Sequence, residues 1–276
     1  MKQILLGYLE RESPVHQLTG ATKLICLILC SFTTMLTYDT RVLMGILIFS
    51  VIIFKISKIK FGEIALVFYF ILVFLALNNL AIFIFSPYEG VKIYNSRTEL
   101  FKIAGHYSMT AEQLFYHLNI TLKYLALVPM TLLFMVATQP SEFAASLNRI
   151  GVSYRIAYAV AIALRYIPDV QRDYQNIAFA AQARGIDMSK KEKVIKRLRN
   201  ITSILIPLIF SSLQRIDTIS CAMELRAFGS HKKRTWYRKK NFATGDYIAL
   251  AVVTVLFILS LFITASNEGR FYNPFH

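Results

Sequence analysis

The sequence predicts an all-α integral membrane protein, with about five transmembrane helices and long amphipathic helices on the cytoplasmic side. Composition is the first reason: 55% of the 276 residues are hydrophobic and only 17% are charged, whereas soluble domains carry about a quarter charged residues. The second reason is the length of the uncharged runs, at residues 64–88, 124–141 and 247–267. Each is close to the roughly 20 apolar residues that a helix needs to cross a bilayer. Such runs are rare in soluble proteins, so a soluble helical fold is disfavoured.

Two further spans are predicted in the N-terminal part of the chain. Residues 18–38 can cross the bilayer if Lys23 lies at the interface and its side chain extends to the headgroups. Residues 42–54 are apolar but short, so they need flanking residues to span, and whether they do so fully stays open.

The net charge of +15 is concentrated in basic clusters. Nucleic-acid binding is one interpretation of such clusters, but beside membrane spans the retention of basic loops on the cytoplasmic side explains them better. We therefore expect no nucleic-acid partner, a cytoplasmic N-terminus, outer segments at 87–112 and 268–276, and an inner segment at 142–246. The clusters are Lys55, Lys58 and Lys60; Lys190, Lys191, Lys193, Lys196, Arg197 and Arg199; and Lys232, Lys233, Arg234, Arg238, Lys239 and Lys240.

Residues 138–245 are expected to form a cytoplasmic domain, distinct from a transmembrane domain of residues 1–137 and 246–276. Apolar residues recur there at i, i+3 and i+4 spacing, which is typical of long amphipathic helices. Two helices are expected, ending near residues 184 and 226. Their apolar positions are Ile167, Val170, Tyr174, Ile177 and Ala181 in the first, and Ile204, Leu205, Leu208, Ile209, Ser212, Ile216, Ile219 and Met223 in the second.

The two helices are rough repeats of each other. Each has a proline near its expected start, Pro168 or Pro207, followed by a Gln-Arg pair at 171–172 or 214–215. Small residues come next, and small residues let helices approach closely. The helices are therefore expected to cross at four small residues, Ala178, Ala181, Ser220 and Ala222.

Each helix ends in an arginine, within the phrases AAQARGIDM at 180–188 and CAMELRAFG at 221–229. Gly185 suits the left-handed conformation that follows many helix C-termini, and the helix dipole favours a cation there. The spacing leaves two interpretations open. Arg184 and Arg226 bind a partner, or they cap their helices and meet phospholipid headgroups.

No metal site, disulfide or resident cofactor is predicted. Cys26, Cys30 and Cys221 suit small apolar packing positions. The chain has no G-x-x-x-x-G-K-[ST] motif for nucleotide phosphates, and its histidines have no metal-ligand spacing. The histidines are His16, His106, His117, His231 and His276.

Three stretches resemble the transmembrane T component (EcfT/CbiQ-like) of energy-coupling factor (ECF) transporters. They are SPVHQLTGATKLI at 13–25, LRYIPDVQRDYQNIAFAAQARGID at 164–187 and IPLIFSSLQRIDTISCAMELRAFG at 206–229. The resemblance covers most of the chain and is strongest over 139–246. It implies a non-catalytic, multi-pass scaffold in the prokaryotic cell membrane. Such a scaffold joins two ABC-type ATPases, identical or different, to a membrane-embedded S component that binds a vitamin or a metal ion, and ATP is bound by the partners.

In this family, arginine-containing tripeptides at the ends of two coupling helices dock into grooves on the ATPases. The matching residues are Ala183, Arg184 and Gly185, and then Leu225, Arg226 and Ala227. The second tripeptide departs from the pattern at both of its outer positions. Because the next glycine, Gly229, lies further on, this helix is expected to extend slightly beyond its arginine. Closure of the ATPases would pull the two arginines together and shift the helices beneath the S component. The small residues Ala178, Ala181, Ser220 and Ala222 would form the helix crossing or contact the S component.

Two other classes of function are weighed against this one. An integral-membrane enzyme acting on lipid-like substrates needs Asp, Glu or His clusters at the membrane, whereas Asp169, Asp173 and Asp217 have arginines near enough to pair with them. A self-sufficient transporter needs polar residues or broken helices at the midplane. Asn78 and Asn79 are the polar residues that point to such a transporter, although a role in interhelical hydrogen bonds explains them better.

Overall fold

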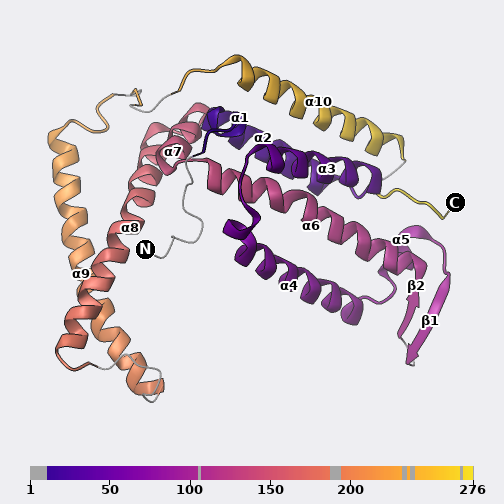
Figure 1. Ribbon diagram of the computed structural model, residues 1–276, viewed down its shortest axis with the longest axis horizontal. Helices are drawn as coiled ribbons and strands as arrows, with labels where there is room; N and C mark the ends of the chain where they lie inside the picture. Colours follow the sequence, from indigo (N-terminus) through magenta and orange to yellow (C-terminus); the bar gives the residue numbers. More distant parts are fainter. Residues whose placement is uncertain are drawn as a thin grey trace. The chain divides into compact units, whose positions relative to one another are not determined.

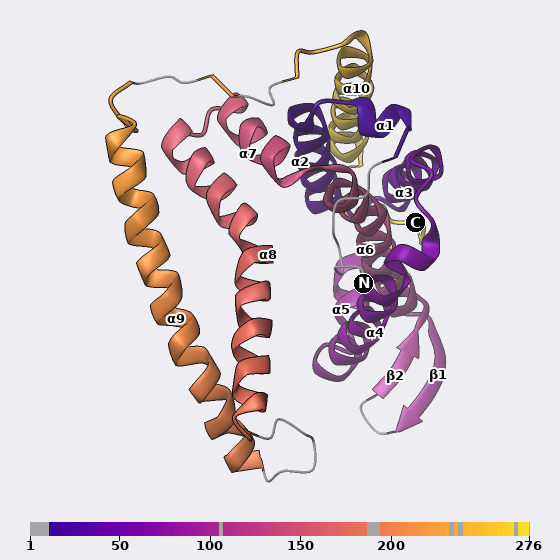
Figure 2. The ribbon, with the colours of Figure 1, turned by 60° about the vertical axis from the view of Figure 1, so that its left-hand side comes forward.

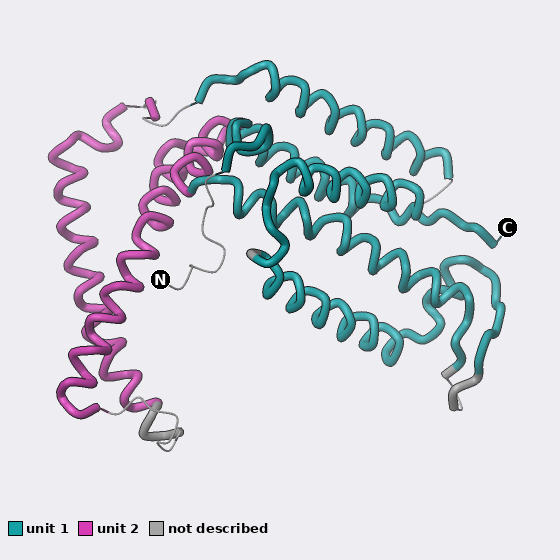
Figure 3. The backbone as a smooth tube through the Cα atoms, in the orientation of Figure 1, with its two compact units in different colours: residues 1–139, 240–276 teal, residues 140–239 magenta. Residues whose placement is uncertain are grey.

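The computed structural model describes residues 11–104, 107–186, 194–231, 235–236, 240–267 and 270–275. These residues form α-helices and one small two-stranded sheet, which confirms the all-α class (Figure 1). The chain divides into two compact units (Figure 3). Unit 1 comprises Met1–Gln139 and Lys240–His276, and unit 2 is Pro140–Lys239.

Unit 1 is a helical bundle built around α6, at Ala111–Ala137. Helices α2, α3, α4 and α5 all contact α6, while α10 packs against α2. The antiparallel strands β1, at Glu99–Ala104, and β2, at Tyr107–Thr110, directly precede α6. The other elements are α1 at Pro14–Gln17, α2 at Gly20–Leu36, α3 at Thr40–Ile56, α4 at Phe61–Phe85, α5 at Glu89–Tyr94 and α10 at Thr244–Ser266.

Four helices in the described residues are long and apolar enough to cross a membrane: Ile64–Phe85 in α4, α6, Leu198–Leu225 in α9, and α10. Three of them carry the predicted runs at 64–88, 124–141 and 247–267. Helices α2 and α3 have 17 residues each, or about 25 Å of helix at 1.5 Å per residue, which is shorter than the roughly 30 Å of a bilayer core. The number of candidate spans thus differs from the expected five, and the amphipathic α9 is apolar enough to be one of them.

The core of unit 1 explains two of the three cysteines. Met130 of α6 packs against Cys30 of α2 and Val253 of α10, with Cys26 beside them. These two cysteines are small apolar packing residues, as the sequence predicts. Cys221 is exposed, so the same prediction is wrong for it.

Lys23 is buried, and its side chain does not extend outward as the sequence analysis expected. Only 6% of the residue is exposed. Its Nζ donates hydrogen bonds to the carbonyl oxygens of Ala137, at 2.8 Å, and His16, at 3.3 Å. Hydrogen bonds of this kind offset the cost of burying an ammonium group. They also fasten the start of α2 to the end of α6.

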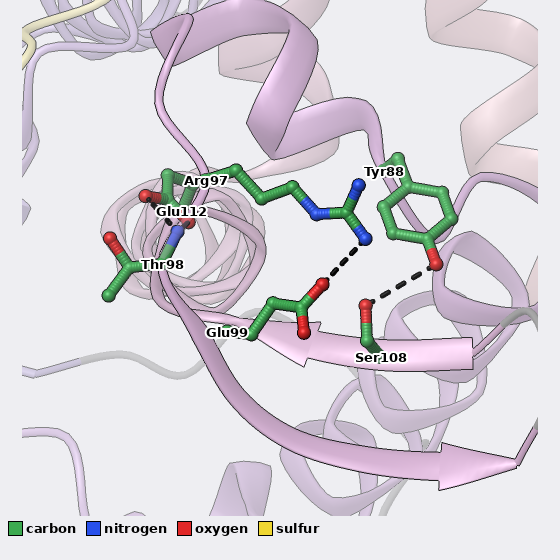
Figure 4. A network of polar contacts seen from close by, with 6 residues as sticks. All are labelled: Tyr88, Arg97, Thr98, Glu99, Ser108 and Glu112. Carbon is green, nitrogen blue, oxygen red and sulfur yellow. Dashed lines mark hydrogen bonds and ion pairs between the residues drawn. The ribbon is translucent and has the colours of Figure 1, made fainter.

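Polar contacts hold the described residues of the segment at 87–112. The Glu112 carboxylate is buried and accepts a hydrogen bond from the Thr98 N–H at 3.0 Å. Next to it, the Arg97 guanidinium pairs with the Glu99 carboxylate at 2.6 Å. Figure 4 shows this network, which comprises Tyr88, Arg97, Thr98, Glu99, Ser108 and Glu112.

Helix α6 begins well before the uncharged run that predicts it, because charged residues in its first half have partners. Besides Glu112, Lys123 donates a hydrogen bond to the carbonyl oxygen of Met35 at 3.2 Å. Its Nζ also lies 3.7 Å from the centre of the Tyr38 ring. A charge with such partners does not have to mark the end of an apolar helix.

One of the two asparagines of α4 makes the interhelical hydrogen bonds that the sequence analysis favours. Asn79 Nδ2 donates to Thr121 Oγ1 of α6 at 3.2 Å. Asn79 Oδ1 lies 2.8 Å from Nδ1 of His117, also on α6. These bonds join α4 to the central helix.

Unit 2 contains α7 at Pro140–Arg149, α8 at Tyr154–Ala183 and α9 at Val194–Leu225. Pro168 and Pro207 lie inside α8 and α9 rather than near their starts. Both helices continue through the proline, which removes one backbone hydrogen bond but does not have to end a helix. As a result, α8 and α9 are longer than the sequence analysis expected.

Candidate functional site

The candidate site is the hairpin of α8 and α9 in unit 2, which Figure 2 shows as two long helices running in opposite directions. Asp173, late in α8, contacts Arg215, and Tyr154, at the start of α8, contacts Phe228, which follows α9. The start of α8 thus contacts the residues that follow α9, and a later part of α8 contacts an earlier part of α9. The two helices are therefore antiparallel. The contacts fall into an apolar zone (Ala178, Ala181 and Ile204), an ionic zone (Asp173 and Arg215) and an aromatic zone (Tyr154, Tyr158 and Phe228).

The first tip, residues 181–186, ends α8 in a Schellman motif. Arg184 is the C-cap residue, and Gly185 follows in the left-handed region with φ at 84°. The Gly185 N–H donates to the Gln182 carbonyl at 2.9 Å, and the Ile186 N–H donates to the Ala181 carbonyl at 3.1 Å. This is the hydrogen-bond pair that defines the motif. Ile186 also packs against the apolar zone, which adds the usual hydrophobic contact.

The second tip, residues 223–228, has the same turn. Helix α9 ends at Leu225, and Ala227 adopts the left-handed conformation with φ at 52°. The Ala227 N–H donates to the Glu224 carbonyl at 2.8 Å, and the Phe228 N–H donates to the Met223 carbonyl at 2.9 Å. The expectation that α9 extends beyond Arg226 is therefore wrong, because Arg226 has the same place in its turn as Arg184 has in the first tip.

The aromatic zone explains how a residue with a Cβ adopts this turn. The left-handed region costs such residues roughly 1 kcal/mol or more. The Phe228 ring offsets this cost by packing on Tyr158 and Tyr154, with ring centres 4.8 Å and 5.7 Å apart. The Arg155 guanidinium also donates a hydrogen bond to the Gly229 carbonyl at 3.1 Å. Contacts with the start of α8 thus hold the second tip in its turn.

The six candidate docking residues are all exposed on unit 2, three at each end of the hairpin. Leu225 is the extreme case, with 90% of its surface exposed beside Arg226. Because the helices are antiparallel, the tips are separated by about the length of α8. Its 30 residues span roughly 45 Å at 1.5 Å per residue. The tripeptides are Ala183, Arg184 and Gly185 at the first tip, and Leu225, Arg226 and Ala227 at the second.

Only two of the four small residues expected at the helix crossing are found there. Ala178 and Ala181 are buried against Ile204 of α9. Ser220 and Ala222 are exposed. The antiparallel direction is the reason, since it places the small residues of α9 at the opposite end of the hairpin from those of α8.

The aromatic zone and the role of the ionic zone are absent from the sequence analysis. Arg215 Nη2 lies 2.6 Å from Asp173 Oδ2, in agreement with the expected pairing of the arginines and aspartates. That this ion pair joins α8 to α9 depends on the antiparallel direction of the two helices. Phe228 directly follows the second candidate docking tripeptide, and this aromatic residue is the signal in the sequence that could have indicated the aromatic zone. Trp236 belongs to the aromatic zone, since its ring centre lies 6.3 Å from that of Tyr158. Its Nε1 also donates to Asn148 Oδ1 of α7 at 3.1 Å.

Several residues of the sequence analysis lie outside the described residues. They are His106, His276, and most of the second and third basic clusters, namely Lys190, Lys191, Lys193, Lys232, Lys233, Arg234, Arg238 and Lys239. Within the described residues, no group of three or more His, Cys, Asp or Glu side chains is arranged to hold a metal ion.

The chain is similar to known proteins over most of its length. A family model described as "CbiQ: Cobalt transport protein" matches residues 11–237. The "Energy-coupling factor transporter transmembrane protein EcfT" of Streptococcus thermophilus is 24% identical over 272 residues, which cover 95% of this chain and 99% of that protein. The Bacillus subtilis protein of that name is 24% identical over 282 residues, covering 96% and 100%. That of Limosilactobacillus fermentum is 35% identical over 105 residues, covering 38% and 39%. The family model spans most of the chain and the first two relatives align over nearly all of it, so the chain belongs to the CbiQ/EcfT family of transmembrane energy-coupling components of transporters.

Proposed function

We propose that this chain is the scaffold of an ATP-driven importer in the bacterial cell membrane. Its α8–α9 hairpin transmits closure of two ABC-type ATPases to a membrane-embedded S component that carries a vitamin or a metal ion. The chain itself catalyses nothing and holds no cofactor, because ATP is bound by the ATPases. The observation that carries the proposal is that both ends of the hairpin present an exposed arginine in the same backbone turn.

The chemistry of the tips suits docking into a groove on a protein. An arginine offers five donors in a rigid planar fork, which match carboxylates and carbonyl oxygens in a partner. Small neighbours, Ala183 and Gly185 at the first tip and Ala227 at the second, let the partner's backbone come close. The Schellman turn fixes the direction in which the chain leaves the helix, so the arginine is held on a rigid end.

The separation of the tips supports one ATPase subunit at each tip. Roughly 45 Å, the length of α8, is too far for one groove to bind both arginines. Closure of the two ATPases would then act on the two ends of one hairpin and move it as a body.

An exposed apolar stripe on α9 is the proposed contact for the S component. Large apolar residues recur along it at the i, i+3, i+4 spacing of one helix face. A stripe of this size on a surface marks an interaction with protein or lipid, and it contributes to making α9 apolar enough to be a candidate membrane span. The residues are Leu198, Leu205, Ile206, Ile209, Phe210, Leu213 and Ile216.

The proposed topology follows from the same assignment. Residues 1–137 and 246–276 form the transmembrane domain with a cytoplasmic N-terminus, and residues 138–245 form the cytoplasmic coupling domain. The basic residues around Lys55–Lys60 and within 138–245 support this orientation, because basic loops remain on the cytoplasmic side.

Charge reversal at the tips tests the proposal in the assembled transporter. Arg184→Glu and Arg226→Glu are each expected to weaken ATPase binding at least tenfold, and the double variant is expected to lose ATPase co-purification and uptake. Loss of one partner of a buried charged contact typically costs about 2–5 kcal/mol. Arg165→Glu makes the same charge change at an exposed site between the tips and is the matched control.

Conservative variants separate docking from contact with lipid headgroups. Lysine satisfies a phosphate as a point charge but does not reproduce the planar fork of arginine. Arg184→Lys and Arg226→Lys are therefore expected to lower ATPase binding. If the double Glu variant keeps ATPase co-purification and uptake intact, the proposed function is wrong.

A further inference from the structure

A cavity of about 550 Å³ lies within unit 1, and the proposed function makes no use of it. Sites that bind small molecules have roughly 300–1,000 Å³, so the cavity is large enough for a ligand. Its lining comes from α1, α2, α3, α6 and α10 and is apolar apart from three side chains, those of Gln17, Lys23 and Asp246. This composition favours a ligand that is mainly hydrocarbon.

The cavity lies at one end of the bundle. Its lining residues belong to the first halves of α2 and α10 and the second halves of α3 and α6. Val253 of α10 packs there with Met130 of α6 and Cys30 of α2, and this layer bounds the cavity. In the second half of α10, Ile263 packs against a cluster that includes Val42 of α3. The cavity therefore takes the place of helix contacts along the first half of α10.

The cavity is open on the side formed by α3 and α10. Three of its apolar lining residues are exposed there, Ile56 of α3 and Ile248 and Val252 of α10. Helix α10 is a candidate membrane span, and lipid tails are as apolar as the side chains of such a helix. An acyl chain can thus enter the cavity sideways from the bilayer.

The size and apolar lining of the cavity suit an acyl chain. An unfilled apolar cavity leaves its lining without dispersion contacts, and it takes up apolar molecules in preference to water. Along α10 the lining extends from Ala243 to Val253, and ten residues of helix rise about 15 Å. This is half of the roughly 30 Å hydrocarbon core of a bilayer, which is the depth of one leaflet.

The three polar side chains gather at the starts of α2 and α10. The Thr19 N–H donates a hydrogen bond to Asp246 Oδ1 at 2.8 Å, and Lys23 Nζ donates to the His16 carbonyl at 3.3 Å. Lys23 and Asp246 are buried and bonded to the protein, whereas Gln17 is exposed. The Gln17 amide has two donors and an acceptor for a lipid headgroup at this end of the cavity.

Exposed basic residues flank the same end of the cavity along the chain. Lys55 precedes the lining residue Ile56 and Lys58 follows it, while Lys240 comes shortly before Ala243. Lysines at the cytoplasmic surface attract the anionic lipids of the inner leaflet. The charge around the polar end therefore complements an anionic headgroup.

We propose that this cavity binds an acyl chain of an anionic phospholipid from the inner leaflet, with the headgroup at Gln17 and the flanking lysines. The lipid supplies the packing that α10 lacks along its first half. The choice of leaflet rests on the proposed topology, whereas the cavity and its lining do not depend on ATPase docking.

Photoreactive lipids test the site in the full chain, reconstituted into vesicles of phosphatidylcholine and phosphatidylglycerol. The probe is phosphatidylglycerol with a diazirine in its acyl chain. Residues 248–253 are expected to be labelled roughly fivefold more than Leu66 and Phe70. These two residues are the reference because they are exposed in the half of α4 nearest to the end of α3. Equal labelling of both stretches would overturn the site.

Filling the cavity should remove the extra labelling. Ala249 lines the cavity and is half-buried, so Ala249→Trp puts an indole into it. Ala251 is exposed on α10 outside the lining, and Ala251→Trp is the matched control. Labelling of 248–253 is expected to fall to the α4 level in the first variant only. Undiminished labelling in a folded Ala249→Trp chain would contradict the proposal, and the comparison with α4 decides it if that variant does not fold.

The headgroup is tested with a matching phosphatidylcholine probe. Replacing Lys55 and Lys58 together by glutamine should lower labelling by phosphatidylglycerol several-fold and leave labelling by phosphatidylcholine unchanged. Equal labelling of the unsubstituted chain by the two probes would overturn the preference for an anionic lipid.

The complete transporter separates this site from the docking proposal. Labelling should persist in the presence of the S component and in the Arg184→Glu, Arg226→Glu double variant. If the S component abolishes labelling, and a photoreactive amino acid at position 252 cross-links to it, the cavity binds that protein and the lipid site is wrong. If labelling persists while the double variant still binds ATPases and transports, the docking proposal falls and the lipid site stands.

Discussion

The two tips of the hairpin reach the same backbone turn from different sequences. The first has glycine at the left-handed position, Gly185, where an added Cβ meets nothing within 4 Å. The second has Ala227 in that conformation, held by the packing of Phe228 on Tyr154 and Tyr158. The comparison teaches that the arginine is placed by the turn, and that either a glycine or the packing of the following residue can secure it.

The largest expected effect comes from removing the aromatic support of the second tip. Phe228→Ala should lower the local unfolding free energy of residues 222–228 by about 2 kcal/mol, less than the 3–5 kcal/mol of a fully buried phenylalanine because Phe228 is half-buried. Hydrogen exchange of these amides in the full chain should accelerate roughly thirtyfold. Ile186→Ala at the first tip is the matched control, and its effect should be smaller because Gly185 favours the turn by itself. Equal protection in Phe228→Ala and the unsubstituted chain would show that the aromatic zone does not hold the tip.

Exchanging the residue types at the left-handed positions should give effects of opposite sign. Gly185→Ala should destabilise the first tip by about 1 kcal/mol, and Ala227→Gly should stabilise the second by about 0.5–1 kcal/mol. Hydrogen exchange at each tip should change about fivefold or less, faster in the first variant and slower in the second. If Ala227→Gly loosens its tip, the turn there is not under conformational strain.

Leu225 should affect docking and not folding. Because 90% of its surface is exposed, Leu225→Ala should leave hydrogen exchange of the second tip unchanged. If Leu225 is buried on binding, the loss of its apolar surface should weaken the ATPase at that tip by about 1–2 kcal/mol, or five- to thirtyfold. The affinity of the purified ATPase for the full chain is the measurement. An unchanged affinity would mean that the leucine does not enter the groove.

The sequence predicts the helical fold and the positions of both arginines, because apolar periodicity and helix-ending signals are local. It does not predict that both helices end in the same backbone turn, because Ala227 is held in that turn by packing against aromatic rings at the start of α8. The crossing residues show the same limit. Ala178 and Ala181 lie in the crossing but Ser220 and Ala222 do not, and only the antiparallel direction of the helices decides this. Lys23 is similar, because its partners Ala137 and His16 come together only in the folded bundle.

The smallest effect is expected at the small residues of α9 that lie outside the crossing. Ser220→Leu adds an exposed side chain, so stability should change by no more than about 0.5 kcal/mol. Ala181→Leu places the same side chain in the buried apolar zone and should cost about 1–3 kcal/mol. Thermal unfolding of the full chain in detergent compares the two, and similar costs would place Ser220 in a helix contact after all.

Photo-cross-linking from the two arginine positions tests the central claim most directly. A photoreactive amino acid is placed at residue 184 or 226 of the full chain, in the transporter assembled with both ATPases and the S component in membranes. We expect each position to cross-link to an ATPase subunit, with the two positions reaching different subunits, since the tips are roughly 45 Å apart. Cross-links from both positions only to lipid or to the S component, or from both to one ATPase subunit, would contradict the account.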